Sequence, residues 1–295
     1  MQAARTRLLA MVLLAAGAAA LHAESLPVGK SQRSITIGDE VIELHTYKPP
    51  QYAGGPILLV LHGLGTNAPG YRDYAISLAD QKGFLVIAPL FDRKRFPVWR
   101  YQTGGLVRDQ RVTGEFHVEP AAQWTGRLFL AIIDAVRSAE GRADLGYSLI
   151  GHSAGGQALS RFAAFVPHQA RHIIIANPST WLWPSRAERF PFGFGGLPAK
   201  MADDAALQRY LAQPVTVLLG TADNKRDSGL NVSAGAEHQG ANRYERGQNA
   251  FRAAQQLARD RGWAFNWRLT EVPDVGHSAR RMIGSPQALT ALSSD

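Results

Sequence analysis

Short apolar runs recur along the chain at spacings that suit the strands of a buried sheet. Most of them are continuous rather than alternating, which is typical of parallel strands covered on both faces. Upstream of these runs, apolar and polar residues alternate on either side of Gly38-Asp39 and predict an antiparallel hairpin over residues 35–47. The continuous runs lie at residues 57–61, 84–89, 147–150, 172–176, 215–219 and 265–272.

Segments with helical periodicity separate several of these runs. Strand and helix therefore alternate, which predicts an α/β fold with a mainly parallel central sheet and helices on both faces. We expect one catalytic domain over residues 24–295. The apolar helix faces comprise Trp124, Leu128, Ile132 and Val136; Ala158, Leu159, Phe162 and Phe165; and Phe251, Ala254 and Leu257.

Two insertions interrupt this alternation. Residues 92–119 are rich in arginine, glycine and turn formers, and residues 177–213 carry aromatic side chains, including Trp181 and Trp183, among prolines and glycines. Long loops without periodicity in a compact domain are usually functional or lid-like. The aromatic insertion either walls an apolar pocket or covers the edge of the sheet, and the two roles do not exclude each other.

The first residues have the pattern of a secretory signal. Arg5 and Arg7 precede an apolar stretch over residues 8–21, and cleavage is expected after Ala23 or Ala20. The stretch is shorter than the roughly 20 apolar residues of a membrane-spanning helix. We therefore expect residues 1–23 to be removed and the mature protein to be periplasmic or secreted, with no stable membrane anchor.

Cysteine content and charge narrow the possible chemistry. The chain has no cysteine, which rules out disulfides, a thiolate nucleophile and a Cys-ligated metal. Its formal charge is +8, and loss of the two arginines in the signal leaves +6. Basic residues are scattered apart from the run at residues 93–95 and the pair Arg280-Arg281. Such scatter favours a solvated surface over a nucleic-acid site.

The strongest chemical signal is Gly151-His152-Ser153-Ala154-Gly155, a G-x-S-x-G pattern between an apolar run and a helical pattern. A strand–turn–helix context gives this motif its meaning, because a tight turn lifts the serine hydroxyl above the sheet edge. The neighbours two residues away must be small, as both glycines are. We therefore predict Ser153 as a nucleophile, with positive dipole density from the following helix.

A second motif, His62-Gly63-Leu64-Gly65, ends an earlier apolar run. Acyl transfer needs two N–H donors directed at the developing oxyanion. The N–H groups of Ala154 and Leu64 are the candidates. For His62 we predict a hydrogen-bonding role in support of the loop rather than a role as base.

These motifs make the chain similar to the α/β-hydrolase superfamily, and to exported esterases related to polyhydroxybutyrate depolymerases and feruloyl esterases. The matching segments are residues 62–65, 151–156, 220–223 and 275–277, which span nearly all of the mature chain. The resemblance implies the α/β-hydrolase fold and the chain order nucleophile, acid, histidine.

That order selects the acid and the base. Asp223 follows the run at residues 215–219 and is the predicted acid, with Asp227 as its nearest competitor, followed by Asp203 and Asp204. His277 follows the last strand-like run and is the predicted base.

Other histidines and aromatic residues have secondary roles in this interpretation. His238 is the alternative base, in a polar segment without a preceding strand. The side chain of His152 is expected to point away from Ser153. We expect His152, Trp181 and Trp183 to contact the substrate.

Cleavage of a small or polymeric carboxylic ester through an acyl-enzyme is the function that these residues favour. The alternatives are a peptidase on the same fold and a catalytically silent binding protein. We see no metal-ligand spacing and no dinucleotide fingerprint, so no cofactor is expected. The substrate and the oligomeric state stay open.

Overall fold

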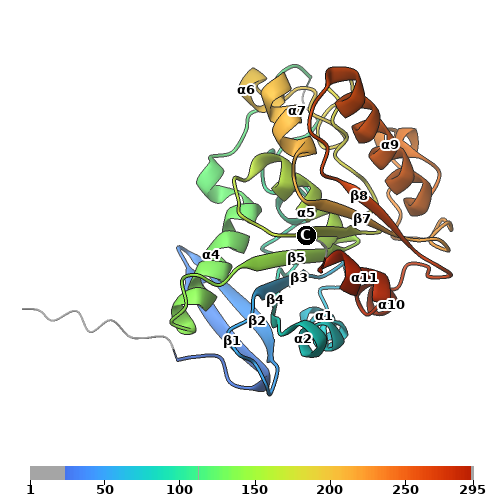
Figure 1. The fold of residues 1–295 in the computed structure, drawn as a ribbon. Coiled ribbons are helices and arrows are strands. Elements are labelled where there is room, and N and C mark those ends of the chain that lie inside the picture. Colours follow the sequence, from blue (N-terminus) through green and yellow to red (C-terminus); the bar gives the residue numbers. More distant parts are fainter. Residues whose placement is uncertain (1–23, 112, 294–295) are drawn as a thin grey trace, which may run out of the picture.

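A computed structural model describes residues 24–111 and 113–293. The predicted signal sequence, residues 1–23, lies outside the described residues. An eight-stranded sheet runs through the centre of the molecule in the order β1-β2-β4-β3-β5-β6-β7-β8 (Figure 1). The strands are β1 (Gly29–Ile37), β2 (Glu40–Lys48), β3 (Ile57–Leu61), β4 (Leu85–Leu90), β5 (Tyr147–His152), β6 (Ile173–Ala176), β7 (Val215–Gly220) and β8 (Arg268–Val272).

Strand direction follows the sequence pattern closely. β1 and β2 form the predicted antiparallel hairpin, with Gly38 at a φ of 56° in the turn. β2 also pairs antiparallel with β4, and the remaining neighbours are parallel. The predicted α/β fold with a mainly parallel sheet is confirmed.

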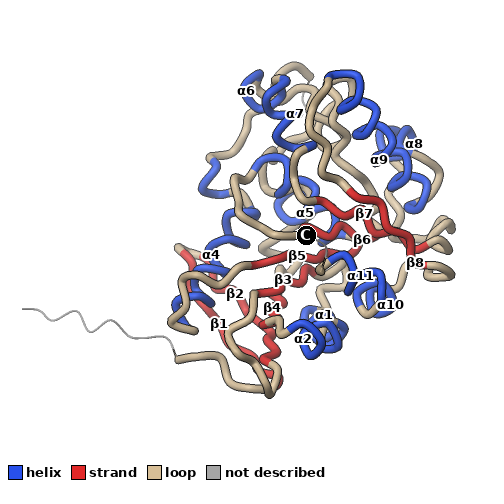
Figure 2. The backbone as a smooth tube through the Cα atoms, viewed as in Figure 1, coloured by secondary structure: helices blue, strands red, loops and turns tan. Residues whose placement is uncertain are grey.

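Helices cover both faces of the sheet (Figures 1 and 2). They comprise α1 (Ala68–Tyr74), α2 (Ile76–Lys82), α3 (Val98–Tyr101), η1 (Ala121–Gln123), α4 (Thr125–Ala139), α5 (Ala154–Phe165), α6 (Ala199–Ala202), α7 (Asp204–Leu211), α8 (Ala234–Gln239), α9 (Arg243–Arg261), α10 (Ala279–Ile283) and α11 (Pro286–Ala291).

Alternate side chains of the central strands enter two separate cores. Leu58 and Val60 of β3 pack with residues of α1, α2, α10 and α11, whereas Leu59 and Leu61 pack with residues of α4, α5, α7 and α9. All four leucine and valine side chains are fully buried. Burial on both faces explains why the sequence of this strand is continuously apolar.

The parallel strands end at one edge of the sheet, and the candidate chemistry follows those ends. β3 precedes His62, β5 precedes Ser153, β7 precedes Asp223, and β8 precedes His277. In open α/β sheets, ligands bind at the carboxyl ends of the strands. The topology therefore brings four distant segments of the chain to one place.

Two expectations about irregular segments need correction. Residues 265–267 are not part of β8, because the Asn266 N–H bonds to the Leu211 carbonyl and the Trp267 indole bonds to the Tyr210 carbonyl. The insertion at residues 177–213 is not wholly irregular, since α6 and α7 occupy its last part. Within the described ranges, no helix combines the length and apolarity needed to cross a membrane.

Candidate active site

Ser153 lies on a strained turn between β5 and α5. Its φ of 57° and ψ of −114° are values that a residue with a side chain rarely adopts. A Cβ on Gly151 would lie 2.5 Å from the backbone of Gly155, and a Cβ on Gly155 would lie 2.3 Å from the Leu61 carbonyl oxygen. The glycines of the motif are therefore needed for the turn to close, and the turn holds the Ser153 hydroxyl at the sheet edge.

Of the three residues predicted to form a catalytic set, His277 lies within hydrogen-bond distance of both Ser153 and Asp223. His277 Nε2 is 3.0 Å from Ser153 Oγ, and His277 Nδ1 is 2.7 Å from Asp223 Oδ2. Asp223 is only 3% exposed and Ser153 8% exposed. A short contact to a buried carboxylate fixes the imidazole orientation, which leaves Nε2 directed at the hydroxyl.

Backbone bonds hold the acid loop and the histidine loop together. The Ala222 N–H donates to the Val275 carbonyl, and the Asp274 N–H donates to the Thr221 hydroxyl. A turn bond from the Asp223 N–H to the Gly220 carbonyl fixes the start of the acid loop. The contact between Asp223 and His277 therefore rests on a rigid frame rather than on two free loops.

Arg243, the first residue of α9, links the two competing carboxylates. Its fully buried guanidinium makes two bonds to Asp227, at 2.7 and 2.8 Å, and lies 3.5 Å from Asp223 Oδ1. The hydrogen bonds from Arg243 lower the pKa of Asp227 to about 2. Asp227 therefore neutralises Arg243, whereas Asp223 is the carboxylate that faces His277.

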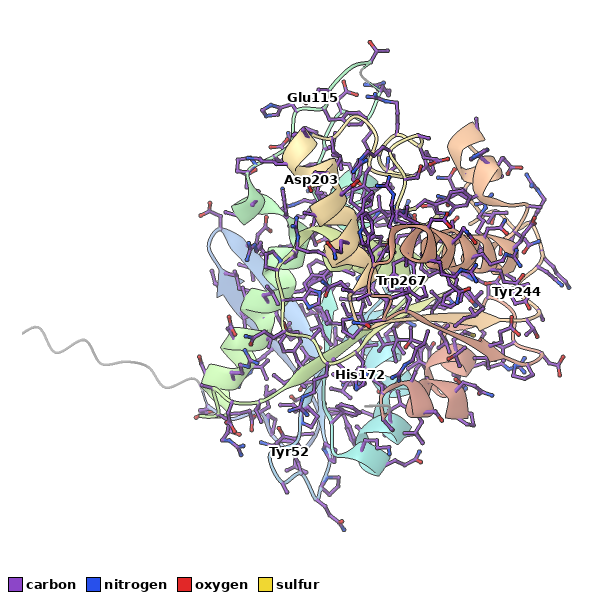
Figure 3. All side chains as sticks on the ribbon, turned by 45° about the horizontal axis from the view of Figure 1, so that its top comes forward. Tyr52, Glu115, His172, Asp203, Tyr244 and Trp267 are labelled. Carbon is purple, nitrogen blue, oxygen red and sulfur yellow. The ribbon has the colours of Figure 1, made fainter. Side chains whose placement is uncertain are left out.

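The remaining competitors lie elsewhere. Asp203 caps α7 by accepting a hydrogen bond from the Ala206 N–H (Figure 3). Asp204 pairs with arginines of other elements. His238 is an exposed residue of α8 that lies 3.5 Å from Glu188. None of these three side chains, Asp203, Asp204 and His238, lines the pocket that contains Ser153.

His62 supports the loop after β3, as expected. Its Nε2 accepts a hydrogen bond from the Phe91 N–H, so the proton is on Nδ1, which lies 2.7 Å from the Gly63 carbonyl oxygen. The Tyr101 hydroxyl donates to the His62 carbonyl. Burial lowers the pKa of His62 to about 4 and keeps the ring neutral. These bonds fix the loop at His62 and Gly63, directly before Leu64. The loop passes close to the serine, since a Cβ on Gly63 would lie 3.6 Å from the Cβ of Ser153.

The predicted oxyanion donors occupy suitable elements. Ala154 is the first residue of α5, where backbone N–H groups are not used within the helix. Leu64 lines the same pocket as Ser153 and is partly exposed. Their catalytic role remains a prediction.

His152 packs against His277. Its ring centroid is 4.5 Å from that of His277, and its Nδ1 is 3.2 Å from the Tyr71 hydroxyl. Desolvation holds the pKa of His152 well below its usual value. The ring is 2% exposed yet borders the pocket, so its main contact is with His277 rather than with open solvent.

The two tryptophans do not line the pocket that contains Ser153, contrary to the expectation for them. Trp181 is fully buried, and its backbone exchanges two hydrogen bonds with the Gln239 side chain. Trp183 is half-buried and contacts the ring of His238. At these two residues the aromatic insertion therefore has a covering role, the second of the two roles that the sequence left open, rather than walling the pocket that contains Ser153.

Two adjoining cavities lie beside the loop at Gly63 and Leu64. The active-site pocket has a volume of about 360 Å³ and includes Ser153, His277, Asp227 and Arg243 in its lining. The second, which we name the side pocket, has about 140 Å³. Its lining comprises His62, Gly63, Leu64, Thr66, Phe91, Arg93, Phe96, Pro97, Val98, Tyr101 and Gln102.

Sequence reasoning missed the aromatic residues of the side pocket. Phe91 directly follows β4 at the functional edge of the sheet, a position that could have drawn attention to it. Phe96 and Tyr101 belong to the insertion at residues 92–119, in which arginine, glycine and turn formers dominate the sequence. The aromatic wall of the side pocket therefore comes from Phe91 and this insertion, and not from residues 177–213.

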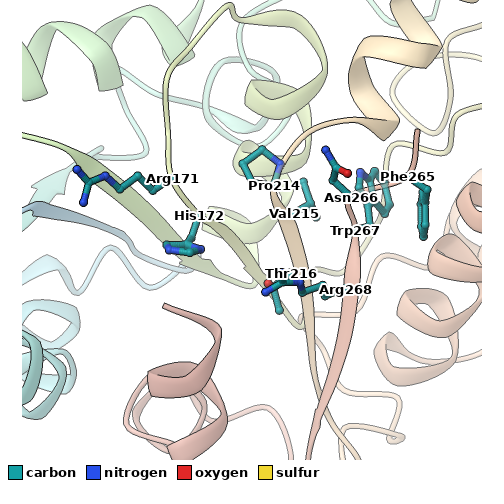
Figure 4. A pocket seen from close by; sticks show the side chains of 9 residues that line it. All are labelled: Arg171, His172, Pro214, Val215, Thr216, Phe265, Asn266, Trp267 and Arg268. Carbon is teal, nitrogen blue, oxygen red and sulfur yellow. The ribbon is translucent and has the colours of Figure 1, made fainter. Parts of the chain in front are cut away.

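A further cavity lies at the opposite edge of the sheet. It has about 420 Å³ and is lined by residues at the starts of β6, β7 and β8, among them His172, Val215 and Arg268 (Figure 4). Parallel strands begin at this edge, so the cavity is separated from Ser153 by the length of the strands. In the described part of the chain, no group of three or more His, Asp or Glu side chains could hold a metal ion.

Comparisons with known proteins extend this picture. No family model matches the chain, and no curated protein matches it. The solved structure of the poly(3-hydroxybutyrate) depolymerase LpqC from Bordetella parapertussis is 30% identical with a TM-score of 0.81, over 90% of each chain. The poly(aspartic acid) hydrolase-1 from Sphingomonas sp. KT-1 is 30% identical with a TM-score of 0.82, over 90% of this chain and 99% of the other.

More distant structures agree in fold. The siderophore hydrolase EstA from Aspergillus nidulans is 13% identical with a TM-score of 0.55, over 98% of this chain and all of the other. Identity at this level bears on the fold alone. Together with the two 30% identical enzymes and the sheet topology, it leads to one assignment. The chain belongs to the α/β-hydrolase superfamily and is a hydrolase.

Proposed function

We propose that this hydrolase is a serine esterase that cleaves carboxylic esters through an acyl-enzyme. The observation that carries the proposal is the continuous series of contacts from Ser153 Oγ through His277 to Asp223, at 3.0 and 2.7 Å. A hydroxyl, an imidazole and a buried carboxylate in this order can generate a nucleophile at neutral pH.

The mechanism divides the reaction into two steps. His277 Nε2 takes the proton of Ser153 as Oγ attacks the acyl carbon, and the N–H groups of Leu64 and Ala154 stabilise the oxyanion. The bond to the leaving alcohol then breaks, and the imidazolium gives its proton to the departing oxygen. Water, deprotonated by the same imidazole, hydrolyses the acyl-enzyme and restores the Ser153 hydroxyl. Asp223 holds the tautomer with the proton on Nδ1 throughout.

A second candidate is cleavage of amide bonds in an acidic polymer. One of the 30% identical relatives is named for poly(aspartic acid), and the positive formal charge of this chain, +8 in full and +6 without the two arginines of the predicted signal, suits a polyanion. The same three side chains would serve amide hydrolysis. The other relative is named for a polyester, and esters are the less demanding substrates, which favours ester cleavage.

Export is part of the proposal. Its support is the pattern of residues 1–23, a positive start, an apolar stretch and small residues before Glu24. Expression of the full chain in a bacterial host, followed by N-terminal sequencing of the periplasmic protein, tests it. Mature chains that begin near Glu24 or Leu21 support export, and uncleaved cytoplasmic protein contradicts it.

The activity is tested with a panel of ethyl and p-nitrophenyl esters beside matched amides, for the wild type and Ser153→Ala. We expect ester turnover in the wild type and none above background in the folded variant. Faster turnover of aspartyl amides than of esters would favour the second candidate. No turnover of either class, together with no reaction of Ser153 with active-site probes, would indicate a silent binding protein.

A further inference from the structure

We propose that the side pocket is an acyl-group site that selects esters whose acyl chain ends in a carboxylate. This inference rests on the proposed function of Ser153. It assigns a substrate class from the shape, the hydrogen-bond donors and the charge of the side pocket.

The position of the side pocket identifies it as the acyl side of the site. His277 must reach the leaving oxygen to protonate it, so the alcohol part of the ester lies in the active-site pocket on the side of His277. The side pocket shares Gly63 and Leu64 with the active-site pocket but has neither Ser153 nor His277 in its lining. It therefore lies across the oxyanion loop, where the acyl chain points.

The walls of the side pocket are apolar. Phe91, Phe96 and Tyr101 are buried, and their rings pack on one another with centroids 4.9 and 5.2 Å apart for the pairs Phe91–Phe96 and Phe91–Tyr101. Val98 is exposed at the rim. A volume of about 140 Å³ is close to that of a cavity of roughly 150 Å³ that accommodates benzene. The space suits a short acyl chain rather than a long fatty one.

A buried amide supplies a donor inside this apolar space. Gln102 is 8% exposed, and its Oε1 accepts a hydrogen bond from the Gln157 amide at 3.3 Å. The Thr180 hydroxyl donates to Gln157 Oε1 and fixes which way Gln157 is turned. In the described ranges nothing accepts a hydrogen bond from the amide nitrogen of Gln102. The amide nitrogen of Gln102, which lines the side pocket, is therefore free to donate to a ligand that brings an acceptor.

The charge at the rim is positive. Arg93 lines the side pocket, is exposed and forms no ion pair with any described residue. No aspartate or glutamate is in the lining, and the neighbouring Asp92 is held by Arg95 at 2.6 Å. A carboxylate on the acyl chain meets one cation and one amide donor here, whereas an ammonium group meets only repulsion.

The test compares two ethyl esters with the same chain length, monoethyl glutarate and ethyl pentanoate, by release of ethanol. We expect the wild type to have the higher kcat/KM for the glutarate, through a lower KM. In Arg93→Gln the ratio of the two kcat/KM values falls about fivefold, the size of an exposed charge pair. Salt at about 1 M, where the Debye length is about 3 Å, lowers the wild-type ratio in the same way.

Two further variants make the result decisive. Arg127→Gln removes an exposed arginine of α4 that lines neither pocket, and it should leave both rates and their ratio unchanged. Val98→Phe narrows the side pocket and should lower kcat/KM for both esters with a five-carbon acyl group, relative to ethyl acetate.

The side-pocket assignment would be overturned if the wild type had an equal or lower kcat/KM for monoethyl glutarate than for ethyl pentanoate, or if the ratio of the two values did not change in Arg93→Gln. In either case, ester turnover that depends on Ser153 would leave the proposed function standing. Loss of that turnover altogether would instead remove the proposed function.

Discussion

The buried guanidinium of Arg243 lies 3.5 Å from Asp223 Oδ1, on the carboxylate whose other oxygen is 2.7 Å from His277. Its two shorter bonds go to Asp227, in the wall of the active-site pocket. The cation therefore lies between the carboxylate that orients the histidine and a second carboxylate that balances its charge. Neither carboxylate can move without changing the surroundings of the other.

Replacing Arg243 should expose this dependence. Arg243→Met leaves two neighbouring carboxylates without their shared cation, and we expect a loss of about 3 to 5 kcal/mol in the free energy of unfolding. Adding Asp227→Asn removes one of the uncompensated charges and should recover part of the loss. Urea denaturation of the two single variants and the double variant measures this coupling. Equal losses in Arg243→Met and the double variant would contradict the shared role of the cation.

The two aspartates should differ sharply in their effect on catalysis. Asp223→Asn keeps the geometry but favours the wrong tautomer of His277, and we expect kcat to fall by about 10⁴-fold. Asp227→Asn changes a group that contacts Arg243 and not the imidazole, so the fall should stay below about tenfold. Steady-state kinetics on one short ester provide the comparison. The reverse ranking would assign the role of acid to Asp227.

The tight turn at the nucleophile should be intolerant of any side chain. In Gly151→Ala the new Cβ would lie 2.5 Å from the backbone of Gly155, which forces the turn apart. We expect a clear drop in melting temperature and loss of activity. Gly65→Ala is the matched control, because no atom lies within 4 Å of its added Cβ, and its stability should change by less than about 0.5 kcal/mol. Similar stability of the two variants would argue against the strained turn.

Buried neutral histidines should make stability depend on pH. Burial lowers the pKa of His62 to about 4, whereas an unfolded chain has a histidine pKa near 6.5. Between these values only the unfolded chain binds the proton, so the free energy of unfolding falls as the pH is lowered, by up to about 1.4 kcal/mol per pH unit for one such group. The stabilisation is complete above about pH 6.5. His152 acts in the same direction.

Urea midpoints between about pH 7 and pH 4 measure this slope. His168 also has its pKa lowered to about 4 by burial, and its Nδ1 accepts a hydrogen bond from the Ala170 N–H. Asparagine can keep that bond, so His168→Asn should be less sensitive to pH than the wild type. His238→Gln, at an exposed histidine, should have the wild-type slope. Stability that does not change over this range would contradict the account.

The strands and the chemical motifs could be predicted from sequence because each depends on neighbouring residues. The continuous apolar run of residues 57–61 matches β3 residue for residue, and the glycines around Ser153 reflect a local steric demand. The order of the motifs along the chain was sufficient to place Ser153, Asp223 and His277 at one edge of a parallel sheet.

The lining of the pockets could not be predicted in the same way. Whether Trp181 faces substrate or the core depends on Gln239, which holds its backbone from 58 positions further along the chain. Arg243 has no local signal, since it appears as one more arginine near the start of a helix. Phe96 and Tyr101 form the side pocket only because β4 ends beside the loop that contains Leu64.

The central claim is that Ser153 is an activated nucleophile, and a fluorophosphonate probe tests it most directly. The probe reacts with a serine only when a neighbouring base removes its proton, and peptide mass spectrometry locates the adduct. We expect one adduct per chain, on Ser153, and its loss in folded His277→Ala. An unlabelled wild-type protein, or an adduct on a different serine, would contradict the account.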